Sequence, residues 1–280
     1  MLADSTYQEK VIMVDTVNYF KKRLKIQQQL GLWIGLADAD GYCAEIAANA
    51  GYDWLLVDGE HAPNNVRTIL TQLQSIAAYP SQPIVRPVTG DVALIKQLLD
   101  IGAQTLLIPM IETAEQAELM VKATRYPPEG IRGVGAVLAR ASRWANIPNY
   151  IHTADQEICI LLQIESKKGL ENLDEILQVE GVDGIFIGPA DLSAELGYRG
   201  QPGHEDVQKI IVEMIKKIHK ANKAAGIFTA DEALIRKYID LGVEFIGIGV
   251  DTCLLMDSMK QLLGKFKTVE PLLKTSNGYN

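Results

Sequence analysis

The chain repeats one pattern along most of its length: a short apolar run is followed by an amphipathic stretch. The runs are continuous and do not alternate strictly between apolar and polar residues, which is typical of strands covered on both faces. The eight runs are GLWIGL (31–36), WLLVDGEH (54–61), PIVRPV (83–88), TLLIPMI (105–111), ICILLQIE (158–165), GIFIGPAD (184–191), AAGIFTA (224–230) and FIGIGVD (245–251).

The stretches between the runs have the spacing of helices. In DVQKIIVEMIKKIHKANKAAG (206–226) the apolar residues form one helical stripe, and Gly226 is expected to stop the helix. Alternating strands and helices predict a parallel sheet. Eight strands in one domain of about 250 residues predict a (β/α)8 TIM barrel. A doubly wound open sheet is the alternative, less favoured because no run is followed by a GxGxxG turn.

Composition narrows the class of protein. The 280 residues carry 27 Lys and Arg against 35 Asp and Glu, a net charge of −8 that argues against nucleic-acid and electrostatic membrane partners. The chain has no signal-peptide layout and no apolar run of membrane-spanning length. Three widely spaced cysteines, Cys43, Cys159 and Cys253, fit reduced thiols. We therefore expect a cytoplasmic protein, with an N-terminal extension and leading helix (1–30), a barrel (31–267) and a C-terminal tail (268–280).

Polar residues recur where the apolar runs end. In a (β/α)8 barrel the active site lies at the C-terminal ends of the strands, so side chains at these positions converge on one mouth. Charged groups there are costly unless they are paired or bind a metal. The residues are Asp58, Glu60 and His61 in the second run, Arg86 in the third, Gln163 and Glu165 in the fifth, Asp191 in the sixth and Asp251 in the eighth.

Each of these side chains also has an interpretation that requires no ligand. Acids near a helix start can cap it or charge its first turn, and an arginine can pair with neighbouring acids. Gln163 and Glu165 carry extra weight, because residues i and i+2 of a strand point the same way. The alternatives are Asp191 and Asp251 as helix caps, Glu165 as a first-turn acid, Arg86 as a partner of Asp58 or Glu60, and His61 as a packed or solvent-facing histidine.

Together these residue types indicate a particular chemistry. Two carboxylates, Glu165 and Asp191, with neutral oxygen donors and water suit a hard divalent cation such as Mg²⁺ or Mn²⁺. An arginine would neutralise a substrate oxyanion, and a histidine near a carboxylate could act as a general base. The apolar runs contain no lysine, so a Schiff-base nucleophile on a barrel strand has no candidate. The pattern predicts a site that binds an α-keto acid and stabilises its enolate.

Four segments resemble one enzyme family. LLVDGEHAPN, RYPPEGIRGVGAVLARASRW, LLQIESKKGLENLDEIL and VEGVDGIFIGPADLSAELGY closely resemble the HpcH/HpaI family of metal-dependent (class II) pyruvate aldolases, from about Gly31 to Lys267. The resemblance implies a (β/α)8 barrel, assembled as a hexamer with the last helix exchanged between neighbours. It also implies reversible retro-aldol cleavage of a 4-hydroxy-2-oxo acid to pyruvate and an aldehyde, with Mg²⁺, Mn²⁺ or Co²⁺ as cofactor.

The resemblance also implies roles for individual residues. It makes Arg86 the group that stabilises the enolate and His61 the general base. Asp100, in LLDIGAQ, would raise the basicity of that histidine, a role that rests wholly on the resemblance. The other implied roles are Glu165 and Asp191 as metal ligands, Gln163, Asp191 and the backbone of Gly188 and Ala190 as substrate-binding groups, and Asp58 as a residue that orients the site.

Two other functions stay open at the level of sequence. A citrate-lyase-like or malyl-CoA-lyase-like enzyme could use the same barrel, and it would need a basic groove for the CoA phosphates. A non-catalytic protein could use a former enzyme scaffold, although both Glu165 and Asp191 are present.

The sequence says least about the aldehyde half of the substrate. The loop FTADEAL (228–234) offers Thr229, Asp231 and Glu232 and no cation, and its acidic groups would repel a distal carboxylate. We therefore expect a hydroxylated neutral aldehyde of the deoxy-sugar-acid type, in preference to the aldehyde from 4-hydroxy-2-oxoheptanedioate. Arginines that could reverse this preference are Arg132, Arg140 and Arg143.

The last helical stretch predicts an interface. Residues 251–266 place an apolar stripe where a monomer would leave it uncovered, so we expect a homo-oligomer. The alternative is packing of this helix against its own barrel. The residues of the stripe are Leu254, Leu255, Met259, Leu262, Leu263 and Phe266.

Overall fold

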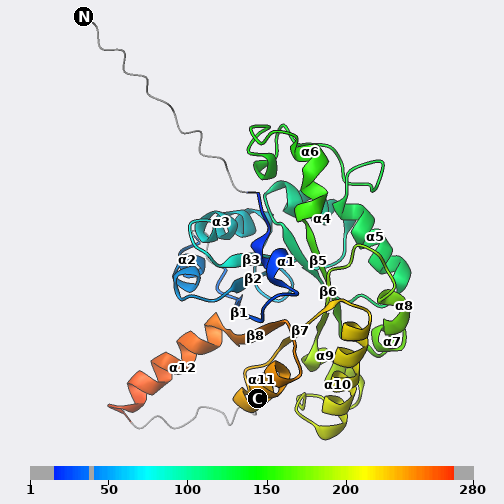
Figure 1. Cartoon of the computed structure of the whole chain (residues 1–280). Coiled ribbons are helices and arrows are strands. Elements are labelled where there is room, and N and C mark those ends of the chain that lie inside the picture. The colour runs from blue at the N-terminus through cyan, green and yellow to red at the C-terminus, as the bar shows by residue number, and fades with distance from the viewer. Residues whose placement is uncertain (1–15, 38–40, 268–280) are drawn as a thin grey trace, which may run out of the picture.

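Eight parallel strands close into a barrel in chain order, as Figure 1 shows for this computed structural model. The structure describes residues 16–37 and 41–267. Each strand pairs with the next, and β1 pairs with β8. The predicted (β/α)8 fold is confirmed. The strands are β1 (Gln29–Ile34), β2 (Trp54–Asp58), β3 (Gln82–Arg86), β4 (Thr105–Ile108), β5 (Cys159–Ile164), β6 (Gly184–Ile187), β7 (Ala224–Phe228) and β8 (Phe245–Val250).

Every predicted run overlaps a strand, but several strands are shorter than their runs. The second run extends to His61, whereas β2 ends at Asp58, and the last polar residues of the run lie in the following loop. The helix predicted to stop at Gly226 is α10 (Glu205–Lys220), and Gly226 lies inside β7. The turn between them instead uses Asn222, which adopts a positive φ of 57°.

Most of the remaining helices connect the strands and surround the barrel. Capping boxes at Asn65 and Thr113 begin two of them, α3 and α5. The helices are α1 (Tyr19–Arg23), α2 (Tyr42–Asn49), α3 (Val66–Ile76), α4 (Val92–Asp100), α5 (Ala114–Thr124), η1 (Arg140–Ser142), α6 (Tyr150–Thr153), η2 (Ala154–Glu157), α7 (Lys167–Glu171), α8 (Leu173–Ile176), α9 (Pro189–Glu195), α11 (Glu232–Asp240) and α12 (Asp251–Gly264). None of the helices in the described part of the chain is long and apolar enough to cross a membrane.

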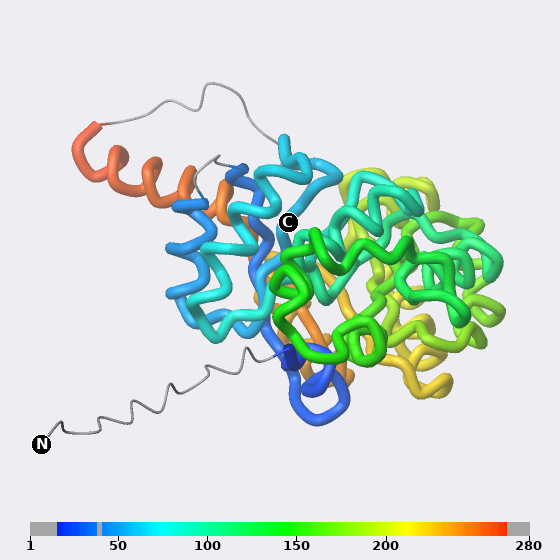
Figure 2. The backbone as a smooth tube through the Cα atoms, turned by 90° about the horizontal axis from the view of Figure 1, so that it is seen from above, coloured from blue at the N-terminus to red at the C-terminus, as the bar shows by residue number. Residues whose placement is uncertain are grey.

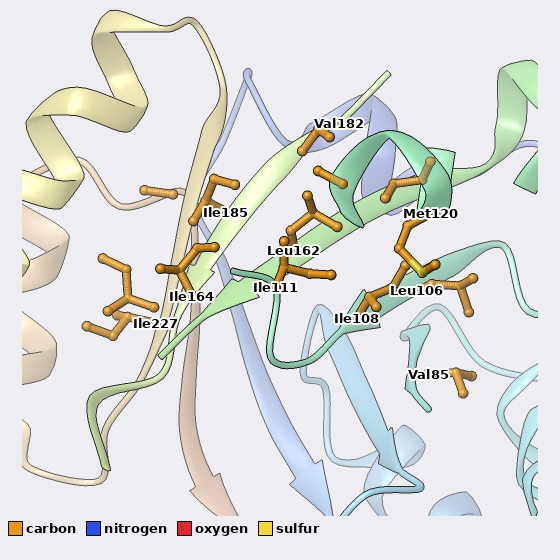
Figure 3. Close-up of a cluster of buried hydrophobic side chains, with 14 of the residues drawn as sticks. Val85, Leu106, Ile108, Ile111, Met120, Leu162, Ile164, Val182, Ile185 and Ile227 are labelled. Carbon is orange, nitrogen blue, oxygen red and sulfur yellow. The ribbon is translucent and has the colours of Figure 1, made fainter. Parts of the chain in front are cut away.

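The larger hydrophobic core lies between the strands and the helices. Figure 3 shows part of it, where Ile108 of β4 lies near Met120 of α5, and Leu162 and Ile164 of β5 belong to the same cluster. These side chains are at most 2% exposed. Burial of a side chain of this size contributes about 1.5–3 kcal/mol relative to exposure. This layer therefore fixes the helices around the barrel.

A second core fills the inside of the barrel with aromatic rings. Trp33, Trp54, Phe186 and Phe245 pack with ring centroids 5.4–6.3 Å apart. Glycine makes room for them: a Cβ on Gly31 would lie 2.0 Å from the Trp54 ring. Several apolar runs, such as GLWIGL and GIFIGPAD, thus combine glycine with an aromatic residue because the barrel interior has no space for more side chains.

The amino end of the barrel is closed by the chain that precedes β1. Phe20 of α1 is fully buried and packs edge-on against Trp54 and Phe245. The buried Asn18 donates from Nδ2 to Thr105 Oγ1 at 2.9 Å, and its N–H donates to Glu157 at 2.7 Å. The segment 125–157, between α5 and β5, lies at this same end. The active-site mouth is therefore left to the opposite, carboxyl end.

Helix α12 leaves the barrel after β8 and projects away from it (Figures 1 and 2). Every residue from Thr252 to Lys267 is exposed. Leu262 is 60% and Phe266 85% exposed. The alternative that this helix packs on its own barrel is wrong for the single chain. Residues 1–15 and the tail 268–280 lie outside the described residues, and the division into extension, barrel and tail stays a prediction.

Candidate active site

Strands β2 and β3 place an acid and an arginine side by side. Asp58 and Arg86 are partners in the register of the two strands, so their side chains leave the sheet in the same direction. Arg86 donates from Nε to Asp58 Oδ1 at 2.9 Å and from Nη2 to Asp58 Oδ2 at 2.7 Å. Both residues are buried. This bidentate pair fixes the guanidinium at the carboxyl end of the barrel.

The third side of the guanidinium is occupied by Glu60. Arg86 Nη1 lies 2.9 Å from Glu60 Oε2, so the arginine is held between two acids. Its guanidinium carbon also lies 5.2 Å from the centre of the Trp33 ring, in the barrel core. Burial raises the pKa of Asp58, but the hydrogen bonds and charge of Arg86 outweigh it, and the net shift is downward. Asp58 is therefore ionised and orients Arg86.

His61 follows these two acids in the loop after β2. Its side chain is 69% exposed, and Nε2 lies 3.7 Å from Glu60 Oε2. The peptide N–H groups of Glu60 and His61 both point to Asp58 Oδ1, at 2.9 and 3.4 Å. The loop is thus folded around the Asp58 carboxylate. This contact carries the imidazole to the rim of the mouth, where a ligand can reach it.

On the other side of the mouth, Gln163 and Glu165 point the same way, as their spacing predicts. Gln163 Nε2 donates to the Glu165 carboxylate, and the N–H of Met110 donates to Glu165 Oε1 at 3.0 Å. Met110 reaches this position with a positive φ of 54°, which is unusual for a residue with a side chain. A Cβ on Gly188 would lie 2.6 Å from Glu165 Oε2. Glycine at 188 therefore lets the carboxylate lie against the backbone.

The environment of Glu165 is suited to a cation. Burial raises the pKa of Glu165 to about 7, the hydrogen bonds from Gln163 and Met110 oppose this, and the charges of Glu60 and Asp191 add to it. Gln163 Oε1 is buried and has no hydrogen-bond partner among the described residues. The same part of the chain contains no group of three His, Cys, Asp or Glu side chains arranged around a metal. Two carboxylates and an unpaired amide oxygen fit a hard divalent cation whose other ligands are substrate and water.

Asp191 lies in the first turn of α9 and is exposed. The interpretation of Asp191 as the cap of this helix is wrong, because the cap position is Gly188 and no side chain bonds there. The N–H of Gly188 donates to the carbonyl of Ile164 at 3.1 Å, whereas that of Ala190 lies in the first turn, where a helix offers no internal acceptor. Of the two predicted backbone donors, Ala190 is therefore the one whose N–H has no acceptor within its own helix.

Asp100 is not brought to His61 within one chain. It ends α4, which runs from the carboxyl end of the barrel to the amino end, and it pairs with the fully buried Arg132 at 2.9 Å. Arg140 donates to the carbonyl of Ile101 at the same end. Arg143 and Arg140 line one small cavity there. These arginines are therefore far from the mouth of their own barrel.

Three features of the site differ from the sequence-based interpretation or were missed by it. Asp251 is the first residue of α12, not its cap, and its carboxylate accepts from the N–H groups of Gly35 and Leu36 at 2.8 and 3.0 Å. Trp33 contacts Arg86 and the N–H of Met110 bonds Glu165, and sequence reasoning missed both residues. An inward-facing tryptophan on a strand that also carries Gly31 was the one available sign for Trp33.

Comparison with known proteins agrees with this geometry. The family model described as HpcH/HpaI aldolase/citrate lyase matches residues 29–258. The chain belongs to the HpcH/HpaI family. A hydroxypyruvate/pyruvate aldolase from Pseudomonas aeruginosa is 60% identical over 262 residues, which are 93% of this chain and 97% of that protein.

Two further relatives support membership of the HpcH/HpaI family. A 4-hydroxy-2-oxo-heptane-1,7-dioate aldolase from Klebsiella pneumoniae is 57% identical, over 89% of this chain and 94% of its own. The crystal structure of a family protein from Burkholderia cenocepacia has a TM-score of 0.86 at 37% identity, and it covers 90% of this chain and 100% of its own.

The buried pair predicts a stability effect. Asp58→Asn should lower the free energy of unfolding at pH 7 by about 3 kcal/mol, because it leaves Arg86 with one acid in a buried site. Folding lowers the pKa of Asp58, so its contribution is complete above its ordinary value of 3.8 and is lost as the pH falls through the folded-state pKa. Urea unfolding should show a constant difference from about pH 5 to pH 7, with convergence in more acidic solution.

The matched control for this prediction is Asp174→Asn. Asp174 pairs with Lys217 at 2.7 Å, but its side chain is 70% exposed, so the loss should stay below about 1 kcal/mol. Equal effects of the two substitutions would contradict a structural role for the buried pair.

Proposed function

We propose that this protein is a divalent-metal-dependent aldolase that reversibly cleaves a 4-hydroxy-2-oxo acid to pyruvate and an aldehyde. The observation that carries the proposal is the fixed arginine, Arg86, facing the same barrel mouth as the carboxylates Glu165 and Asp191. Its relatives are named as aldolases at 55–60% identity, which favours this reaction over citrate-lyase-like chemistry. The enzyme is accordingly a carbon–carbon lyase.

Glu165 and Asp191 would hold the cation, which would polarise the keto group of the substrate when bound. Gln163 and the N–H of Ala190 would bind the carboxylate and orient the pyruvate half. Mg²⁺, Mn²⁺ and Co²⁺ are the candidate ions.

Arg86 and His61 divide the remaining chemistry between them. As the C3–C4 bond breaks, its electron pair moves into the pyruvate half and the C2 oxygen gains negative charge. The guanidinium of Arg86 is already positioned by Asp58, so it stabilises this charge without reorganisation. The imidazole of His61 accepts the proton of the C4 hydroxyl, directly or through one water, and the C4 carbonyl of the aldehyde forms. Protonation of C3 from solvent completes pyruvate, and the imidazolium returns its proton to solvent, so that one proton is taken up for each one released.

A second copy of the chain is part of the proposal. Asp100 lies at the amino end of its own barrel, so if it assists a histidine, that histidine belongs to a neighbouring subunit. The exposed apolar residues of α12 need a cover, and an exchanged helix in a homo-oligomer, which we propose is a hexamer, provides one. The cytoplasm is the proposed location, in keeping with Cys159 and Cys253, which form no disulfide in the described structure.

For the aldehyde half we propose a neutral hydroxylated aldehyde. Within one chain Arg132, Arg140 and Arg143 lie at the far end of the barrel and cannot meet a distal carboxylate at the mouth. Asp231 caps α11, accepting from the N–H of Leu234 at 2.9 Å. A pyruvate-release assay over a panel of 4-hydroxy-2-oxo acids tests this choice. A kcat/KM at least about tenfold higher for the heptanedioate than for deoxy-sugar acids would reverse it, since tenfold corresponds to 1.4 kcal/mol.

The metal prediction concerns Glu165 and Asp191. Glu165→Gln or Asp191→Asn should reduce pyruvate release to below about 1% of wild type, because each removes a charged ligand, while circular dichroism stays that of the folded protein. A chelator should inactivate the wild type, and added Mg²⁺ or Mn²⁺ should restore it. Trapping of a pyruvate–lysine adduct with borohydride would contradict the proposal.

The base prediction separates two reactions. His61→Ala should slow aldol cleavage by about 10²–10⁴-fold, the contribution typical of a general base. Decarboxylation of oxaloacetate needs the enolate but no hydroxyl proton transfer, so its rate should fall far less. Arg86→Ala should slow both. Equal losses in the two reactions of His61→Ala would mean that His61 serves in binding.

The assembly prediction concerns α12. Light scattering at micromolar concentration should report an oligomer for the wild type. Leu262→Asp combined with Leu263→Asp should dissociate it, because two buried charges at an interface cost several kcal/mol. Leu119→Asp, at an exposed leucine of α5, is the matched control and should leave the mass unchanged. A monomeric wild type would refute the oligomer.

A further inference from the structure

The contacts of Glu60 set it apart from the other acids at the mouth. One carboxylate oxygen, Oε2, lies 2.9 Å from Arg86 Nη1 and 3.7 Å from His61 Nε2. This oxygen is buried, yet it accepts no well-aligned hydrogen bond from the described residues. It therefore has a lone pair available for the imidazole or for a water between the two groups.

The pKa of Glu60 depends on the charges of its two neighbours, Arg86 and His61. Burial raises the pKa of Glu60, the charges of Arg86 and His61 lower it, and those of Asp58 and Asp191 raise it, with a net upward shift. Glu165 lies across the mouth, and the charge of Glu60 contributes to raising the pKa of Glu165. The ionised form of a carboxylate in this position is stabilised most when a positive charge forms beside it. Proton uptake by His61 produces such a charge.

We propose that Glu60 is a positioning residue that orients the His61 imidazole within its own subunit and stabilises the imidazolium formed in aldol cleavage. The proposal rests on the proposed function, because it assigns Glu60 a part in that reaction. It differs from the role inferred for Asp100, which lies at the opposite end of the same barrel. A base held by Glu60 is assembled by one chain, since Asp58, Arg86, Glu60 and His61 all belong to β2, β3 and the loop after β2.

Three enzymes test this role: Glu60→Gln, Glu60→Asp and the double variant Glu60→Gln with His61→Ala. Kinetics of aldol cleavage and oxaloacetate decarboxylation are measured on each, with circular dichroism and thermal melting to verify folding. Glu60→Gln should lose at least tenfold in kcat of cleavage and less than threefold in decarboxylation.

The other two variants separate positioning from structure. Glu60→Asp keeps a negative charge beside Arg86 but moves it away from the imidazole, because the side chain is shorter. It should therefore slow cleavage more than decarboxylation, as Glu60→Gln does, but with a smaller loss in kcat. It replaces Glu60→Gln in the test if that variant does not fold. In the His61→Ala background, Glu60→Gln should cost cleavage less than twofold more, because the two residues act as one unit. The matched control is Glu244→Gln, which breaks a carboxylate–imidazole pair with His219 (3.1 Å) at the amino end and should change neither reaction.

Several outcomes would overturn the proposal. Equal losses in cleavage and decarboxylation would mean that Glu60 acts only through Arg86, which serves both reactions. Unchanged kinetics would remove any role, and additive losses with His61→Ala would show that Glu60 does not act through the histidine. Absence of cleavage by the wild type on every 4-hydroxy-2-oxo acid would instead refute the proposed function.

Discussion

The aromatic packing inside the barrel is the constraint on which the site depends. Trp33 and Trp54 fit because Gly31 leaves space between them, and Phe20 seals the amino end beneath them. The Trp33 ring then forms the floor on which the Arg86 guanidinium rests, at 5.2 Å. A looser core would let the arginine move, and pre-organised charge is what makes such a group effective in catalysis. The contact between the Trp33 ring and the Arg86 guanidinium therefore links the packing of the barrel core to the geometry of the site.

The acids at the mouth oppose folding but serve binding. Glu165, Glu60 and Asp191 repel one another, and burial of Glu165 adds a desolvation cost that raises its pKa to about 7. Removing one of these charges would relieve repulsion, so the arrangement is not explained by stability. Asp58 is the exception, because its pair with Arg86 lowers its pKa. One acid thus stabilises the fold, and the others leave negative charge at the mouth that a cation or a protonated histidine would neutralise.

Much of the fold and part of the site could be predicted from local pattern. The eight strands follow from continuous apolar runs, and the convergence of Asp58, Arg86 and Glu165 follows from parallel strands that end at one mouth. The i, i+2 spacing gave the contact between Gln163 and Glu165. Met110 could not be found this way, because its part is played by a backbone N–H in an unusual conformation. Nor could a role for Asp100, since its helix carries it to the far end of the barrel, away from the residues at the mouth.

The position of Asp100 has a consequence for the whole assembly. A (β/α)8 barrel separates its two ends by the length of its strands, so no side chain at the amino end can reach the mouth of the same barrel. The segment 125–157 nevertheless exposes large apolar residues at that end: Val134 is 66%, Val137 71% and Leu138 87% exposed. Exposed apolar surface of this kind, like that of α12, is typical of protein–protein interfaces. Contact between the amino end of one barrel and the mouth of another would cover it and bring Asp100 near a second His61. In that arrangement Glu60 would support the base from within and Asp100 from outside, and dissociation would remove the second carboxylate while leaving the first.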